Sequence, residues 1–159
     1  MRVLDLACGE GRHAIAAAAL GAEVVAVDVD AARIAAAKAR AEAERVRVEW
    51  CVLDLAAGPW PNWGRFDAVL VFNYLDRGRM PEVVDLVAPH GVLIMETFLE
   101  LQAELEWGPQ DPAHLLRDGE LARLVRPLVP YFGREALEPV DVERWRAVAS
   151  IVAGTGRRS

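Results

Sequence analysis

The segment Leu4-Asp5-Leu6-Ala7-Cys8-Gly9-Glu10-Gly11-Arg12 decides the fold class of this chain. Its first residues continue an apolar strand pattern that begins at Arg2, and its glycines interrupt that pattern just before an Ala-rich stretch typical of a helix. Glycine permits close approach of backbone to a ligand, and a helix that starts at such a turn is expected to offer free N–H groups. The segment therefore predicts a ligand-binding turn between a first strand and a first helix.

Two ligands are consistent with this turn. The stretch from Gly9 to Ala14 fits the dinucleotide pattern G-x-G-x-x-A, and Asp28 follows about 20 residues later, as the ribose-binding acid of an NAD site does. Asp5 argues against NAD, because a carboxylate beside the turn repels a pyrophosphate and attracts an ammonium group. S-adenosylmethionine carries an ammonium group and no phosphate, so the residues favour it over NAD.

The chain around this segment alternates strands and helices up to residue 98, which is typical of a parallel sheet with crossover helices. We expect five strands in this part, the fourth of them buried on both faces, at 2–6, 22–28, 45–52, 66–72 and 91–98. The helices between them are predicted at 11–20, 31–44 and 80–88. Residues 99–113 are expected to form a loop insertion, followed by a helix at 120–125. The last two strands, 129–138 and 144–153, are joined too closely for a crossover and are expected to pair antiparallel.

Composition limits the function classes. The chain has 159 residues, of which 53% are apolar and 26% charged, as in one globular domain spanning residues 1–159. A net charge of −6 argues against nucleic acid or an anionic membrane surface as a partner. The sequence shows neither a membrane-spanning stretch nor a secretory signal, so we predict a cytoplasmic protein. The two cysteines and three histidines have no ligand-like spacing, so no metal site is predicted.

The order of motifs resembles that of class I S-adenosylmethionine-dependent methyltransferases. The likeness is greatest to small bacterial methyltransferases of the tellurite-resistance type, which share the segment 5–12, Asn73-Tyr74-Leu75, Glu96-Thr97-Phe98 and His114-Leu115-Leu116-Arg117-Asp118-Gly119-Glu120-Leu121. The resemblance covers essentially the whole chain. It implies an α/β fold, with a Rossmann-like, mostly parallel sheet of seven strands, helices on both faces and a C-terminal antiparallel hairpin.

The resemblance also implies the cofactor site. Asp5, Gly9 and Gly11 match the first motif, with Ala7 where a glycine is common. Asp28 matches the acid that holds the ribose hydroxyls, and Asp54 the acid near the adenine. The predicted contacts to S-adenosylmethionine are Asp5, Ala7, Cys8, Gly9, Gly11, Asp28, Val29, Asp54, Leu55 and Asn73.

The methyl acceptor is expected at the end of the fourth strand. The segment Asn73-Tyr74-Leu75-Asp76 lacks the prolines of the N-P-P-Y motif of amino-group methyltransferases, so we predict a small molecule rather than DNA or a protein amide. Candidates for the acceptor pocket are Arg12, His13, Tyr74, Arg77 and His114. Tyr74 and His114 are the candidate catalytic residues. An amine or hydroxyl acceptor needs a base, for which His114 or His13 is the candidate, whereas a thiol or chalcogen oxyanion needs no strong base.

One departure from these relatives concerns the start of the chain. They have a helical segment ahead of the first strand, and here the sequence begins with the strand itself. We expect either an open cofactor site or weak cofactor affinity restored by a partner subunit, for example in a homo-oligomer. A non-catalytic cofactor-binding or regulatory domain of the same fold is the alternative function, and an NAD-dependent oxidoreductase is a further one.

Overall fold

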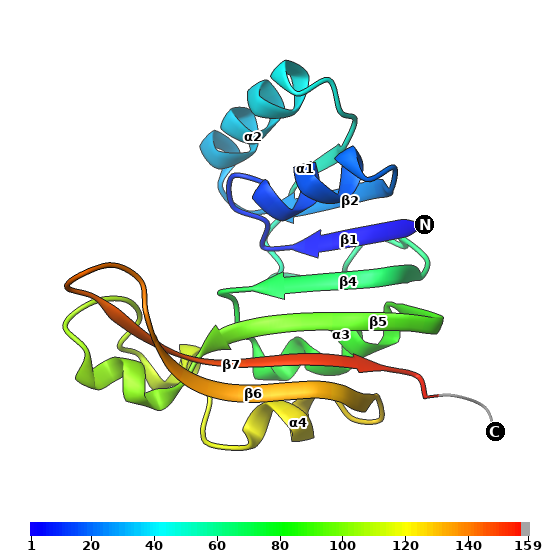
Figure 1. Cartoon of the computed structure of the whole chain (residues 1–159). Coiled ribbons are helices and arrows are strands. Elements are labelled where there is room, and N and C mark those ends of the chain that lie inside the picture. The colour runs from blue at the N-terminus through cyan, green and yellow to red at the C-terminus, as the bar shows by residue number, and fades with distance from the viewer. Residues whose placement is uncertain (157–159) are drawn as a thin grey trace.

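The computed structural model describes residues 1–156 and contains a seven-stranded sheet in the order β3-β2-β1-β4-β5-β7-β6 (Figure 1). The five N-terminal strands run parallel, and β7 pairs antiparallel with both β5 and β6. The strands are β1 (Arg2–Leu6), β2 (Glu23–Asp28), β3 (Glu49–Val52), β4 (Phe66–Phe72), β5 (Val87–Phe98), β6 (Val129–Pro139) and β7 (Trp145–Gly154). The mostly parallel sheet and its C-terminal hairpin confirm the predicted fold class.

The helices begin and end where local sequence signals place them. Asp30 caps the helix that begins at Ala31, because its side chain accepts hydrogen bonds from the N–H groups of Ala32 and Arg33. Gly21 follows the helix that ends at Ala19 and has a φ of 91°, the left-handed conformation common after a helix C-terminus. The helices are α1 (Arg12–Ala19), α2 (Ala31–Ala43), α3 (Met80–Asp85) and α4 (Glu120–Leu124), and three short 3₁₀ turns lie at Arg77–Arg79, Glu100–Glu104 and Pro112–His114.

The two faces of the sheet are covered differently. On one face, core residues such as Leu6, Val71 and Leu93 pack with side chains of α3 and α4. On the opposite face, a smaller cluster that includes Val24 and Ala26 packs under α1, which lies over β1 and β2 (Figure 1). The part of this second face formed by β4, β5 and β7 has no helix of residues 1–156 in front of it (Figure 1).

Three of the expected boundaries are wrong. The third strand begins at Glu49 rather than at residue 45, because Arg45 has a φ of 56° and residues 46–48 form a connection. Helix α3 ends at Asp85, and β5 begins at Val87, so the expected helix to residue 88 and strand from residue 91 are both shifted. The fourth strand is fully buried on one face only, because α1 covers just part of the other face, where Ala68, Leu70 and Phe72 are half-buried.

The segment between β5 and α4 is fastened at both ends. Leu99 forms a parallel bridge with Leu116, so the two ends of the segment lie side by side. Within it, the fully buried Gln102 side chain donates a hydrogen bond to the Trp107 carbonyl and accepts one from the Ala147 N–H, both at 2.9 Å. These two bonds attach the loop insertion to β7.

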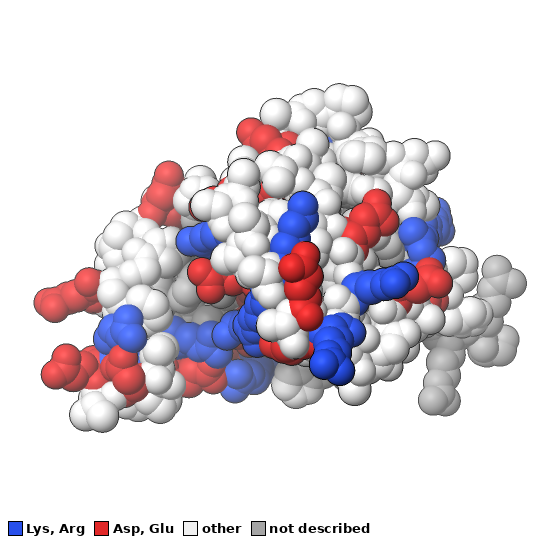
Figure 2. Space-filling view, turned by 90° about the horizontal axis from the view of Figure 1, so that it is seen from above, with Lys and Arg blue, Asp and Glu red and all other residues white. Residues whose placement is uncertain are grey.

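The surface carries charges of both signs. Figure 2 shows Lys and Arg side chains interspersed with Asp and Glu on the face seen from above, without an extended field of one sign. Among residues 1–156, no helix has both the length and the apolar character needed to cross a lipid bilayer.

Gly11 is the glycine on which the first turn most depends. Its φ is 75°, and a Cβ at this position would lie 2.5 Å from Cη2 of Trp50 and 3.1 Å from Cβ of Ala37. We expect Gly11→Ala to lower the free energy of unfolding by about 3 kcal/mol, from overpacking added to backbone strain. Urea denaturation monitored by circular dichroism measures the loss.

Gly58 provides a matched control for this substitution. Its φ is 65°, but an added Cβ would meet nothing within 4 Å. Gly58→Ala therefore tests the backbone strain alone, which we expect to cost about 1 kcal/mol. Equal losses for the two variants would show that the contact with Trp50 is unimportant.

Candidate functional site

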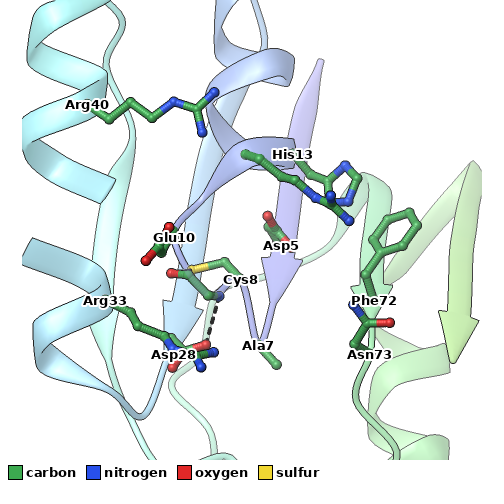
Figure 3. Close-up of a pocket in the computed structure, with 12 residues that line it drawn as sticks. Asp5, Ala7, Cys8, Glu10, His13, Asp28, Arg33, Arg40, Phe72 and Asn73 are labelled. Carbon is green, nitrogen blue, oxygen red and sulfur yellow. Dashed lines mark hydrogen bonds between the residues drawn. The ribbon is translucent and has the colours of Figure 1, made fainter. Parts of the chain in front are cut away.

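A cavity of about 540 Å³ lies at the carboxyl ends of β1, β2 and β4 (Figure 3). This edge of a parallel sheet is where α/β folds bind ligands. The cavity combines predicted site residues with four that were not predicted, Glu10, Arg33, Arg40 and Phe72. The predicted residues that line it are Asp5, Ala7, Cys8, Gly9, Arg12, His13, Asp28 and Asn73.

The turn between β1 and α1 is held by hydrogen bonds within the protein. The N–H of Cys8 bonds to the Val27 carbonyl, and the N–H of Gly11 bonds to the Cys8 carbonyl, both at 2.9 Å. The N–H of Gly9 donates to Oδ2 of Asp28 at 2.8 Å (Figure 3). The expectation that this turn offers free N–H groups is therefore wrong for these three residues, because the turn uses them to close on β2.

Two residues other than glycine have left-handed backbone at the rim of this cavity. Ala7 has a φ of 56° and Asn73 a φ of 57°. A glycine would adopt this conformation without strain, whereas the side chains of Ala7 and Asn73 make it costly. Strained backbone of this kind clusters at functional sites.

Asp5 is the most unusual group of the cavity. Asp5 is 1% exposed, and its Oδ2 has no hydrogen-bond partner within residues 1–156. Burial raises the pKa of this carboxyl to about 7, with a further rise from nearby Asp28, against the opposing effects of the Ala14 N–H and the Arg12 guanidinium. A cationic ligand group would supply the partner that this carboxylate lacks.

Two neighbours of Asp5 are uncharged at neutral pH. Burial, together with Asp5 and Asp28, raises the pKa of the Cys8 thiol to about 12, so this cysteine is not an activated nucleophile. The His13 ring stacks on Phe72 with a centroid distance of 4.0 Å. Burial and the adjacent Arg12 lower the pKa of His13, so its imidazole is neutral at pH 7. The pair forms an aromatic wall beside Asp5 (Figure 3).

The remaining acceptor candidates lie in a second cavity of about 390 Å³. Tyr74, Arg77 and His114 line it, together with Ala56 and Ala113 among others. Burial, with a contribution from Asp76, raises the pKa of Tyr74, so its hydroxyl keeps its proton at neutral pH. The structure thus divides the predicted acceptor residues between two cavities.

Arg77 is engaged by partners within the chain. Its Nε donates to Glu120 at 2.6 Å, and its Nη2 donates to the Leu115 carbonyl at 2.6 Å. The Arg77 guanidinium holds the pKa of Glu120 down at about 2. These bonds tie the turn after β4 to the start of α4.

Four predicted cofactor residues do not line the first cavity. Gly11 is buried behind the turn, and Leu55 is 5% exposed in the core. Val29 is 65% exposed. Asp54 is exposed, and its Oδ1 accepts a hydrogen bond from the Ala56 N–H at 2.9 Å. Val29 and Asp54 follow directly on β2 and close after β3, at the same edge of the sheet as the cavity.

Three of the four unpredicted residues lie at positions that a sequence pattern could have indicated. Arg33 and Arg40 are seven residues apart on α2, a spacing that places them on one side of a helix. Phe72 is the last residue of β4, next to the predicted Asn73.

Residues 1–156 contain no cluster of three His, Cys, Asp or Glu side chains suited to a metal ion.

Comparisons with known proteins give a family and a fold. A family model described as "Methyltransferase domain" matches residues 3–91. No curated protein sequence matches this one significantly.

Among solved structures, TehB from Haemophilus influenzae has 18% identity and a TM-score of 0.78 over 98% of this chain, which spans only 57% of TehB. An S-adenosylmethionine-dependent methyltransferase from Clostridium acetobutylicum ATCC 824 has 12% identity and a TM-score of 0.75, with coverage of 98% and 84%. The N-methyltransferase NodS from Bradyrhizobium japonicum WM9, in complex with S-adenosyl-l-homocysteine, has 18% identity and a TM-score of 0.71, with coverage of 96% and 77%. These likenesses show a shared fold.

Proposed function

This chain belongs to the methyltransferase domain family, and from that premise we propose that it transfers a methyl group from S-adenosylmethionine to a small-molecule acceptor. The observation that carries the proposal is Asp5, a buried carboxylate whose Oδ2 lacks a partner beside the first turn. A buried carboxylate is stable in its charged form only when a cation or several donors contact it. The ammonium group of S-adenosylmethionine is such a cation.

Arg12 offers the opposite charge in the same cavity. It lines the cavity with Asp5, and within residues 1–156 its guanidinium forms no ion pair. An amino-acid group, with one ammonium and one carboxylate, therefore finds both countercharges. We assign Asp5 to the ammonium and Arg12 to the carboxylate of the methionyl part of the cofactor.

Asp28 is suited to the ribose. Its Oδ2 accepts the Gly9 N–H and its Oδ1 accepts the Asp30 N–H, which leaves each oxygen able to accept a further bond from a hydroxyl. The adenine then extends along the carboxyl edge toward Val29, Asp54 and Leu55. A pyrophosphate is less suited to this site, because the N–H groups of Cys8, Gly9 and Gly11 are already bonded within the protein. This argues against NAD.

The role of the chain in the reaction is mainly to orient and to exclude water. When bound, S-adenosylmethionine supplies an electrophilic methyl group for in-line displacement by a nucleophile. Asp5, Arg12 and Asp28 would fix the donor, and the stacked His13 and Phe72 would shield the adjacent space from water. The neutral His13 imidazole is suited to take a proton from an amine or hydroxyl acceptor, whereas a thiol has no need of a strong base. Tyr74 and His114 remain candidates for contact with the acceptor from the second cavity.

Calorimetric titration at two pH values tests this proposal. We expect S-adenosylmethionine and S-adenosylhomocysteine to bind at pH 8, with no heat from NAD. Because the pKa of Asp5 is about 7 in the free protein and the ammonium requires its ionised form, affinity falls as pH is lowered through 7. The dissociation constant should rise about tenfold between pH 8 and pH 6, and binding at pH 6 should release the Asp5 proton to the buffer.

The outcomes separate the competing functions. Binding of NAD in preference to S-adenosylmethionine would support an oxidoreductase instead. Binding of S-adenosylmethionine without turnover over thiol, amine and hydroxyl acceptors would favour the non-catalytic alternative. Affinity independent of pH would remove Asp5 from the ammonium site while leaving the choice of cofactor intact.

A further inference from the structure

We propose that two copies of this chain associate through their β6 strands, which pair antiparallel about a twofold axis at Ala136 and join the two sheets into one. Strand β6 is the last strand of the sheet and has β7 on one side only (Figure 1). Within residues 1–156, no strand lies on its other side. An exposed strand edge of this kind is a template for pairing with another chain. This proposal is independent of the proposed methyl transfer.

The backbone of β6 has free bonding groups along this edge. The N–H of Val140 donates to the Arg144 carbonyl at 2.8 Å where the hairpin closes, which fixes the alternation of the ladder. Every second residue counted back from Val140, such as Ala136, therefore bonds to β7. The residues between them, which include Gly133, Glu135 and Leu137, direct their N–H and C=O groups away from β7. These outward groups can form a second antiparallel ladder.

The side chains of β6 are unusually apolar for so exposed a strand. Val129, Tyr131, Phe132 and Leu137 are each large, hydrophobic and 49–55% exposed. Exposed apolar side chains concentrated on one element are typical of an interaction surface. With the axis at Ala136 the two strands overlap over residues 133–139, so pairing would reduce the exposure of Leu137 and of Phe132 beside the overlap.

The charges of β6 favour one register for pairing with a second copy of the same strand. With the axis at Ala136, Arg134 lies opposite the partner subunit's Glu138, and the same contact is repeated across the axis. An axis at Arg134 or Glu135 would instead place a charge opposite its own copy, which is destabilising in a sheet. Charge order along the strand is therefore complementary to a second copy of itself.

The residues around the axis fit this register in two further ways. Phe132 lies opposite the partner subunit's Val140, the residue that follows β6, so an apolar pair lies beyond each ion pair. Pro139 has no N–H to donate and lies opposite the partner subunit's Gly133, the residue with the least bulk to oppose a proline ring. The Pro139 carbonyl can still accept a hydrogen bond from that glycine.

Sedimentation velocity of the full chain, with two charge variants, tests the proposal. We expect the wild-type protein to sediment as a dimer at micromolar concentrations. Arg134→Glu and Glu138→Arg should each weaken the dimer by about a hundredfold, because the axis makes every repulsive contact twofold. An equimolar mixture of the two variant chains should restore a dimer, since each acidic position then faces a basic one.

The mixture also controls for folding, because chains that cannot fold would not reassociate. Within one chain Arg134 pairs with Glu138, which also pairs with Arg146, so each variant places two like charges in its own strand. Mixing does not relieve that repulsion, so a dimer restored by mixing reports contacts between the chains. A third variant, Leu137→Pro, removes one outward N–H without touching the bonds to β7 and should weaken the dimer as well. A wild-type monomer at 100 micromolar, or a dimer indifferent to the charge variants, would overturn the proposal.

Discussion

Replacing Asp5 with asparagine is expected to stabilise the free protein and to weaken cofactor binding about a hundredfold, two large effects of opposite sign. The folded state raises the pKa of Asp5 from 3.8 to about 7, so it binds this proton more tightly than the unfolded chain does. Stability of the wild-type protein is therefore lost as pH rises from about 4 to 7, by up to about 4 kcal/mol. Asparagine carries no charge and escapes this penalty.

The measurement is chemical denaturation of both proteins at pH 5 and pH 8. The wild-type protein should be the less stable of the two at pH 8, and the difference should narrow at pH 5. Calorimetry at pH 8 should show S-adenosylhomocysteine bound about a hundredfold more weakly by Asp5→Asn, because the ammonium loses its countercharge. Asp85→Asn, at an exposed acid on α3, is the matched control and should change neither quantity. A variant that binds normally would remove Asp5 from the site.

Asp28→Ala is expected to weaken cofactor binding by at least tenfold, equivalent to about 1.4 kcal/mol. The Asp28 carboxylate has two tasks, since it holds the N–H groups of Gly9 and Asp30 and is assigned to the ribose hydroxyls. Removal of the side chain leaves both N–H groups without their acceptor and loosens the turn. Calorimetric titration with S-adenosylhomocysteine measures the combined loss.

A 2′-deoxy analogue of S-adenosylhomocysteine separates the two tasks. If Asp28 binds the hydroxyl, the analogue binds the wild-type protein more weakly, but Asp28→Ala no longer distinguishes it from the natural compound. Asp111→Ala is the matched control, because Asp111 also accepts the N–H of the residue two positions later but lines neither cavity. We expect it to leave the affinity unchanged. Equal discrimination by Asp28→Ala and wild type would contradict the ribose contact.

Patterns within single elements were sufficient for most of the fold. Apolar runs place β1, β2 and β4, and the close spacing of the last two strands predicts their antiparallel pairing. The start of β3 could not be predicted, because Arg45 adopts a left-handed conformation that propensity disfavours for arginine. The half-buried face of β4 depends on which helices cover it, which is a property of the assembled sheet.

In the candidate site, too, local sequence patterns identify some residues, and contacts between distant segments determine the rest. Asp5, Gly9 and Asp28 are fixed by one strand-turn-helix segment and the strand after it, so short-range motifs identify them. The sequence around Arg77 indicates no partner for its guanidinium, but Glu120, 43 residues further along the chain, accepts a hydrogen bond from it. No local pattern reports such a contact. The bonding of the turn's own N–H groups was likewise hidden, since it depends on where β2 lies beside β1.

The bridge between Leu99 and Leu116 separates the segment between them from the strands and helices on either side. Because its two ends lie side by side, we expect substitutions in this segment that spare buried Gln102 to leave β5 and α4 in place. Ala113 and His114 belong to it and line the second cavity, whereas the first cavity is built entirely from residues 5 to 73. Substitutions at Ala113 and His114 are therefore expected to alter the second cavity without altering the residues that line the first.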